Sequence, residues 1–192
     1  MLKTTKKLAL NSKILRFFLI PTILFSTPFL SQIQVAKAGL EFQWDQNSGH
    51  RRLKWLQKQN KRGFRNTIYF FLRPFDRNNE LLKINLAIPK SFKSNLNKEK
   101  ISLCKVRIGG FENRTKCLED IPADIEINTD DSSLRSINIY PFRPIPSNKD
   151  SYAIVLKVFN PRKSGLHQFH SYGQPKGKSV SSYLGSWTIV ID

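Results

Sequence analysis

The sequence contains few residues of the kinds that bind metal ions. It has two cysteines and three histidines among its 192 residues. Two cysteines do not complete a structural zinc site, which usually has four ligands. His167 and His170 would face opposite sides of a β-strand, because side chains alternate along a strand, and so could not share a metal ion. We therefore expect no metal site and no cofactor.

Long apolar runs and catalytic motifs are also scarce. After residue 38 no segment approaches the roughly 20 apolar residues of a membrane-spanning helix. The serine-nucleophile motif Gly-x-Ser-x-Gly is absent. Paired glycosidase carboxylates are distant in sequence and cannot be matched from the sequence alone. We therefore expect no transmembrane segment in the mature chain, and a protein that is not an enzyme.

The first 38 residues have the three-part layout of a secretory signal peptide. Basic residues precede an apolar stretch over residues 17–30, and Ala36 and Ala38 are the small residues that a signal peptidase reads. Pro21 and Pro28 interrupt the stretch, which disfavours the alternative of a retained anchor helix. We expect cleavage after Ala38, export to the periplasm or cell surface, and a single domain over residues 39–192.

The chain is strongly basic. It has 32 Lys and Arg against 14 Asp and Glu, a net charge of +18. The leader holds six of these bases and no acids, which leaves 26 against 14, or +12, in the mature chain. Such a charge attracts polyanions, and the candidates are anionic lipid headgroups, acidic polysaccharide and nucleic acid. Export argues against nucleic acid. The alternative is that the charge only keeps the protein soluble.

One stretch is especially basic and contains no acid. Trp55 and Phe64 lie within it, so cations and aromatic rings could together engage phosphate or sulfate and stack on a sugar ring. The alternative is a solvated sheet edge with two core aromatics. The hypothetical anion-binding residues are Arg51, Arg52, Lys54, Lys58, Lys61, Arg62 and Arg65.

The two cysteines, Cys104 and Cys117, are expected to form a disulfide, as an even number of cysteines in an exported chain favours. Residues 101–108 alternate in the manner of a strand, Gly109 and Gly110 indicate a turn, and residues 115–118 form a plausible return strand. In this hairpin Cys104 would lie opposite Cys117.

Short strand patterns separated by turn residues continue along the mature chain. They predict an all-β fold, a two-layer antiparallel β-sandwich of immunoglobulin-like or Greek-key type, with a barrel as the second choice. Residues 50–61 fit either a short helix or a strand, and we favour the strand. Pro141, Pro144 and Pro146 predict an extended segment that cannot donate hydrogen bonds to a sheet. The other predicted strands are 67–73, 82–88, 124–128, 135–140, 152–159, 166–172 and 184–191, with loops at 129–133 and 173–182.

Several short motifs resemble an uncharacterised family of exported cyanobacterial proteins, domain of unknown function number twenty-eight hundred and eight. The resemblance implies an exported β-rich protein and no activity. The motifs are Gly39-Leu40-Glu41-Phe42-Gln43-Trp44, Ser102-Leu103-Cys104-Lys105-Val106, Gly109-Gly110, Cys117, Pro144-Ile145-Pro146, Lys149-Asp150, Asn160-Pro161, Gly165-Leu166-His167-Gln168-Phe169 and Tyr183-Leu184-Gly185-Ser186-Trp187.

These features together predict an exported, non-catalytic binding or envelope-associated structural module. Its expected partner is an anionic envelope component, either a lipid headgroup or an acidic polysaccharide. An alternative is a hydrolase of envelope polysaccharide or peptidoglycan, which a serine beside a histidine, or two facing carboxylates, would favour. A third interpretation is a sorting or adhesion domain that adds a partner strand to an exposed sheet edge.

Overall fold

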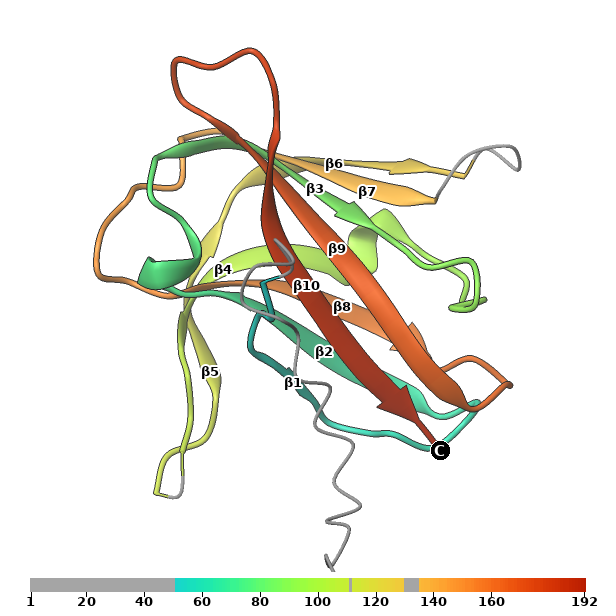
Figure 1. The fold of residues 1–192 in the computed structure, drawn as a ribbon. Coiled ribbons are helices and arrows are strands. Elements are labelled where there is room, and N and C mark those ends of the chain that lie inside the picture. The colour runs from blue at the N-terminus through green and yellow to red at the C-terminus, as the bar shows by residue number, and fades with distance from the viewer. Residues whose placement is uncertain (1–50, 111, 130–134) are drawn as a thin grey trace, which may run out of the picture. The chain divides into compact units, whose positions relative to one another are not determined.

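The computed structural model describes residues 51–110, 112–129 and 135–192, all within the unit Gln43–Asp192. These residues form ten strands in two five-stranded sheets, and every neighbouring pair of strands is antiparallel (Figure 1). The predicted two-layer antiparallel β-sandwich is therefore confirmed. The predicted signal peptide, residues 1–38, and its helix lie outside the described residues.

The strands are distributed evenly between the two sheets. The first sheet has the order β1 (Trp55–Gln57), β2 (Arg65–Leu72), β8 (Tyr152–Phe159), β4 (Ile101–Arg107) and β5 (Lys116–Ile121). The second has the order β10 (Ser182–Ile191), β9 (Gly165–Pro175), β3 (Leu81–Ala87), β7 (Ser136–Pro141) and β6 (Ala123–Asn128). Two 3₁₀ turns, Pro74–Asp76 and Lys98–Lys100, lie in connections between the sheets. None of the described residues forms a helix that could span a bilayer.

The main core lies between the sheets and includes an aromatic cluster. Phe70 of β2 packs against Phe169 of β9 and Trp187 of β10, with ring centres 5.0 and 4.9 Å apart. Trp187 is fully buried, and its Nε1 donates to the carbonyl oxygens of Lys54 (3.1 Å) and Phe71 (3.3 Å). The indole therefore fills the core and also ties the two sheets together.

A smaller apolar cluster lies on the opposite face of the first sheet. Tyr69 and Phe71 alternate along β2 with core residues, and they pack there with Cys104 and Val106 of β4. The predicted disulfide between Cys104 and Cys117 is present in this cluster, with Cα atoms 5.7 Å apart. It therefore staples the β4–β5 hairpin on the outer side of the sheet.

The predicted register of this hairpin is wrong. Cys104 pairs with Asp120, and Cys117 pairs with Val106, so the two cysteines are diagonal neighbours. The turn is centred one residue further along the chain than predicted, so that Arg107 pairs with Lys116, and an irregularity between Lys105 and Val106 shifts the register by one more residue. Diagonal neighbours on one face are still close enough for the bridge.

The N-terminal part of the described chain runs as an extended segment between the two sheets' edges. The preference for a strand over residues 50–61 is confirmed by β1, and Leu53 is 1% exposed. Arg51 and Leu53 exchange backbone hydrogen bonds of 2.7 Å with Ser186 of β10. Gly185 has φ +148°, and a Cβ there would lie 2.6 Å from the Arg51 carbonyl oxygen. A glycine is therefore needed for this close approach.

The proline-rich segment after β7 does contribute to a sheet, which corrects the expectation from the sequence. Pro141 is the last residue of β7, and Ile145 exchanges two 2.9 Å backbone hydrogen bonds with Leu81. Ile145 retains the N–H that its proline neighbours lack, so it can donate to the sheet where they cannot. The predicted loop at 173–182 is shorter in the structure, because β9 continues to Pro175. Most of the loop predicted at 129–133 lies outside the described residues.

Candidate functional site

The seven basic residues predicted to bind anions are all exposed, but they do not form one patch. They follow the β1 edge from one end of the sandwich to the other. We call the end where β2 finishes the Asp76 end, and the end where β10 finishes the Asp192 end. Arg51 and Arg52 lie toward the Asp76 end, since Arg51 forms an ion pair with Asp76 and Arg52 bridges to Ser186. Lys61 and Arg62 lie at the Asp192 end.

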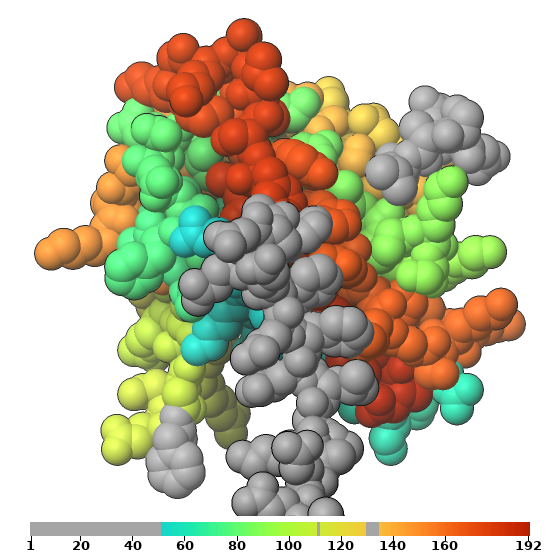
Figure 2. All heavy atoms as spheres, viewed as in Figure 1, coloured from blue at the N-terminus to red at the C-terminus, as the bar shows by residue number. Residues whose placement is uncertain are grey.

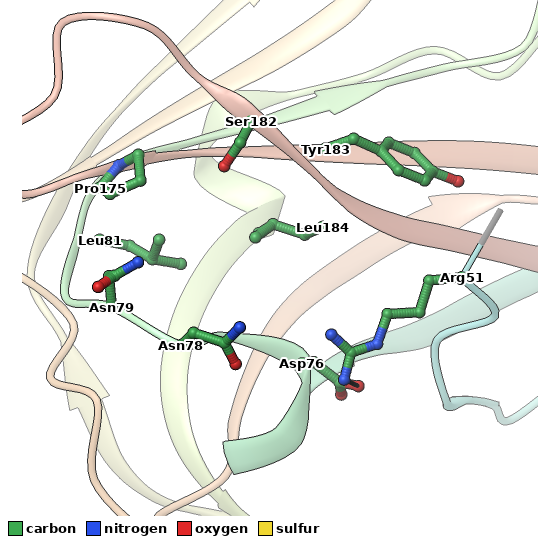
Figure 3. Close-up of a pocket in the computed structure, with 9 residues that line it drawn as sticks. All are labelled: Arg51, Asp76, Asn78, Asn79, Leu81, Pro175, Ser182, Tyr183 and Leu184. Atoms are coloured by element: carbon green, nitrogen blue, oxygen red, sulfur yellow. Dashed lines mark ion pairs between the residues drawn. The ribbon is translucent and has the colours of Figure 1, made fainter. Parts of the chain in front are cut away.

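A small pocket of about 240 Å³ lies at the Asp76 end. Figure 3 shows the Arg51 side chain reaching toward Asp76, with Asn78 next to Asp76 and Asn79 farther along, beside Leu81. The Asp76 side chain is buried and accepts hydrogen bonds from Arg73 Nε (3.0 Å) and Nη2 (3.2 Å). This hydrogen bond is also the main cause of the raised pKa of Arg73. Arg51 Nη2 lies 3.6 Å from the same carboxylate, so one of the seven predicted cations already has an internal partner.

A larger pocket of about 740 Å³ lies at the Asp192 end, and we call it the end pocket. It lies between the β3–β4 connection and the β8–β9 connection, which both project at the right of Figure 2. Lys93 of the first connection and Arg162 and Lys163 of the second line it, and none of its lining residues is acidic. Among the described residues, no acidic group lies within ion-pair distance of these three cations.

Two buried asparagines position the basic turn beside the end pocket. Asn66 Nδ2 donates to Asn160 Oδ1 at 2.9 Å, and both residues are at most 3% exposed. Asn160 Nδ2 donates in turn to the carbonyl oxygens of Gln59 (3.1 Å) and Lys61 (2.9 Å). Because buried polar groups are costly to leave unpaired, this network fixes residues 59–66 against the β8–β9 connection. Lys61, Arg62 and Arg65 are thereby held near Arg162 and Lys163.

Two exposed phenylalanines accompany these cations. Phe159 lines the end pocket and is 58% exposed, and the Arg65 guanidinium lies over its ring, 5.4 Å from the centre. Phe64 in the neighbouring turn is 56% exposed. The predicted association of cations with aromatic rings thus occurs, but Trp55, the other aromatic named from the sequence, packs partly buried against the core.

Three contacts hold the β3–β4 connection in place. Ser94 Oγ donates to the Phe159 carbonyl oxygen at 2.7 Å. Arg135 donates to the carbonyl oxygens of Phe92 (3.2 Å) and Ser94 (2.8 Å). Ser91 Oγ lies 3.0 Å from His167 Nδ1. Lys93 therefore projects from a segment that is anchored on both sides.

His167 is the one ring at the end pocket that can change its charge near neutral pH. It is 2% exposed, and burial lowers its pKa. Its Nε2 is buried without a hydrogen-bond partner in the described part of the chain. We place the proton of the neutral ring on Nδ1, donated to Ser91, because a buried N–H without an acceptor is costly. In this form the ring does not act as a base toward Ser91.

His170 lies on the other face of β9, as alternation predicted, and its Nδ1 is 2.8 Å from Ser186 Oγ. Within the described residues, no three His, Cys, Asp or Glu side chains lie close enough to hold a metal ion.

A third pocket of about 610 Å³ has several carboxylates in its lining. Glu119, Asp120 and Asp150 line it, together with the 74% exposed ring of Phe142. Lys105 Nζ donates to Asp150 Oδ2 at 2.8 Å, and this hydrogen bond raises the pKa of Lys105. Glu119 and Asp120 are consecutive residues of β5, so they point to opposite faces of the strand.

Sequence reasoning identified the basic turn but missed Lys93, Arg162 and Lys163. The signal for the β8–β9 connection was the Asn160-Pro161 turn followed by two bases, which was interpreted only as the end of a strand. Lys93 had no local signal, because its position beside Arg162 depends on the pairing of β4 with β8.

Comparisons with known proteins identify a family and several solved structures of low similarity. The family model described as "Protein of unknown function (DUF2808)" matches residues 44–191. No curated protein is significantly similar in sequence. Among solved structures, the bacterial hydrophobin BslA is similar at 10% identity and a TM-score of 0.44, over 73% of this chain and 91% of that chain.

Two further solved structures have similar scores. A collagen-binding domain from a Staphylococcus aureus adhesin has 13% identity and a TM-score of 0.37, over 71% of this chain and 95% of that chain. An uncharacterised protein from Nocardia farcinica with an immunoglobulin-like fold has 9% identity and a TM-score of 0.40, over 73% and 97%. Similarities of this size carry no inference about ligand or activity.

Proposed function

The chain belongs to the family of proteins of unknown function DUF2808, whose model covers residues 44–191. Since this family assigns no reaction, we propose that the chain is an exported, non-catalytic module that binds an anionic polymer of the cell envelope. The observation that carries this proposal is the end pocket. Lys93, Arg162 and Lys163 line it without an acidic neighbour among its lining residues.

The electrostatics favour an anion over a neutral ligand. Three unpaired cations around one pocket repel one another, and an anion that enters relieves this repulsion. Phosphate, sulfate and carboxylate groups all fit this chemistry. The exposed ring of Phe159 adds a surface on which a sugar ring can stack. A polymer that carries both anionic groups and sugar rings would use both features.

The test is the binding of the full-length protein to heparin, used as a sulfated polysaccharide probe, over a series of salt concentrations. The site variant is K93Q/R162Q/K163Q. The matched control is R114Q/K116Q/K149Q, which removes one Arg and two Lys from exposed positions elsewhere. We expect the site variant to lose at least tenfold in affinity and the control less than threefold.

The salt dependence gives a second, independent readout. Each lost phosphate or sulfate contact reduces the slope of log K against log salt concentration by about one, so the site variant should lose up to about three. Equal losses of affinity in the site and control variants would show that only the net charge acts, and the proposal would then fail.

A hydrolase acting on envelope polysaccharide or peptidoglycan is the second candidate function, and the Ser91–His167 contact is the observation that favours it. Ser91 is exposed in the end pocket, so its hydroxyl is accessible to a substrate. Against this role, a proton taken from Ser91 would create a charge on a ring that is 2% exposed. Release of soluble fragments from purified peptidoglycan or acidic polysaccharide, abolished by S91A, would establish this function in place of binding.

A further inference from the structure

We propose that the polyanion bound by this module is an extended linear chain, which lies along the β1 edge and enters the end pocket with one of its ends or bends. This inference rests on the proposed function and adds the shape of its ligand. A lipid surface and a compact anion are the competing ligands, and both are included in the test.

The β1 edge presents cations in a row. Lys54, Leu56 and Lys58 alternate with residues that face the core, where Trp55 packs. Lys58 Nζ lies 5.8 Å from the centre of the Tyr69 ring, which places it on the outer face of the first sheet. Lys54 and Lys58 therefore point to the same side, about 13 Å apart along an extended strand.

The row of cations continues around a turn toward the end pocket. After Lys58 the chain turns, and the Arg62 amide donates to the Asp192 carbonyl oxygen at 3.1 Å. The Gly63 amide donates to the carbonyl oxygens of Asn160 and Pro161, both at 3.3 Å. These bonds set the turn directly against the connection that carries Arg162 and Lys163. The track thus runs from Arg52 through Lys54, Lys58, Lys61 and Arg62 to the end pocket.

The length of this track selects an extended ligand. From Arg52 to Lys61 the chain covers nine residues, or up to roughly 30 Å at about 3.3 Å per residue. A single phosphate or sulfate group meets only one part of it. A linear polyanion meets all of it, and each additional contact releases counterions.

The placement of the cations argues against a flat membrane surface. The track follows a sheet edge and then turns onto an end of the sandwich, so a plane that touches the β1 row does not also enter the end pocket. Two acids lie beside the track and limit it: Asp76 pairs with Arg51, and the Asp192 carboxylate accepts a hydrogen bond from the Asn60 side chain. We therefore begin the track at Arg52.

The experiment compares ligand length with variant position. The full-length protein is titrated with a heparin tetrasaccharide, with long-chain heparin, and with vesicles that contain phosphatidylglycerol. The edge variant R52Q/K54Q/K58Q is compared with the pocket variant K93Q/R162Q/K163Q and the control R114Q/K116Q/K149Q. All nine positions are exposed, and circular dichroism checks that each variant is folded.

We expect the pocket variant to bind both heparins at least tenfold more weakly than the unmodified protein does. The edge variant should lose at least tenfold in affinity for long-chain heparin and less than twofold in affinity for the tetrasaccharide. If the pocket variant weakens binding but the edge variant behaves as the control does, the linear track is wrong and the proposed function stands. If neither heparin binds saturably to the unmodified protein, the proposed function itself fails. Tighter binding to the vesicles than to long-chain heparin would overturn the choice of a polymer.

Discussion

The guanidinium carbon of Arg77 lies 4.5 Å from the centre of the Tyr152 ring. Arg77 is 3% exposed, and it donates to the carbonyl oxygens of Leu72 (2.9 Å), Pro146 (3.1 Å) and Asp150 (2.6 Å). Burial lowers the pKa of its guanidinium. One side chain therefore joins the end of β2 to the connection between β7 and β8 at the Asp76 end.

We expect R77K to destabilise the fold by about 2–5 kcal/mol, because an ammonium group cannot reach the several acceptors of the planar guanidinium and leaves buried carbonyls unpaired. Urea unfolding followed by tryptophan fluorescence measures the change. The control R107K replaces an exposed arginine and should change stability by less than about 0.5 kcal/mol. Similar effects of the two substitutions would show that Arg77 acts only as a surface charge.

Loss of the disulfide should weaken the fold substantially. Cys104 and Cys117 are 13 residues apart, and bridging a loop of about this length stabilises by about 3 kcal/mol in the chain-entropy model. We expect C104S/C117S to lose about 2–5 kcal/mol, measured by thermal or urea unfolding without reductant. The unmodified protein with reductant should then unfold like the variant. An unchanged midpoint in the double variant would refute a stabilising role.

Replacement of Trp187 should be among the most damaging core changes. W187A removes a fully buried ring that packs on Phe70, and we expect a loss of about 3–5 kcal/mol. W187F retains part of the ring packing but removes the donor to the Lys54 and Phe71 carbonyl oxygens, so its loss should be smaller. The exposed Phe64 supplies the control, since F64A should be close to neutral. Denaturant midpoints of the three variants test this order.

Acid should destabilise the fold through His167. Burial lowers the pKa of this residue below the ordinary histidine value of 6.5. As the pH falls through about 6.5 the unfolded chain takes up a proton that the folded chain resists, so the stability present above this pH declines below it. We expect the free energy of unfolding to decrease from about pH 7 to pH 5, and H167Q to lose most of this slope.

The H167Q variant also supplies the contradicting outcome. If it keeps the full pH slope of the unmodified protein, the buried ring is not the source of the pH dependence.

The sequence was sufficient to predict the fold class, because alternation along segments such as residues 82–88 reports which face is buried. It also predicted the disulfide. It did not predict the hairpin register, because neither the exact centre of the turn nor the irregularity between Lys105 and Val106 leaves a mark on the alternation of neighbouring residues. Strand ends were also imprecise where β9 continues past Tyr172 to Pro175.

The sequence predicted only those cations of the candidate site that are neighbours along the chain. Arg62 and Arg65 stood out as part of a local run of bases, whereas Lys93 and Lys163 became their neighbours through pairings between strands far apart in sequence. The asparagine pair that fixes this arrangement, Asn66 and Asn160, is 94 residues apart, and neither residue is unusual in its local context.

The segment around β1 and strand β10 run side by side in the same direction, from the bridge between Arg52 and Ser186 to the bond between Asn60 and Asp192. Opposite pulls on Arg51 and on Asp192 would slide these two segments past each other. The hydrogen bonds at Leu53, Gln57 and Asp192 would then be strained simultaneously. A pull perpendicular to the strands would instead break these bonds one after another. The domain is thus arranged to resist mechanical tension between its two ends.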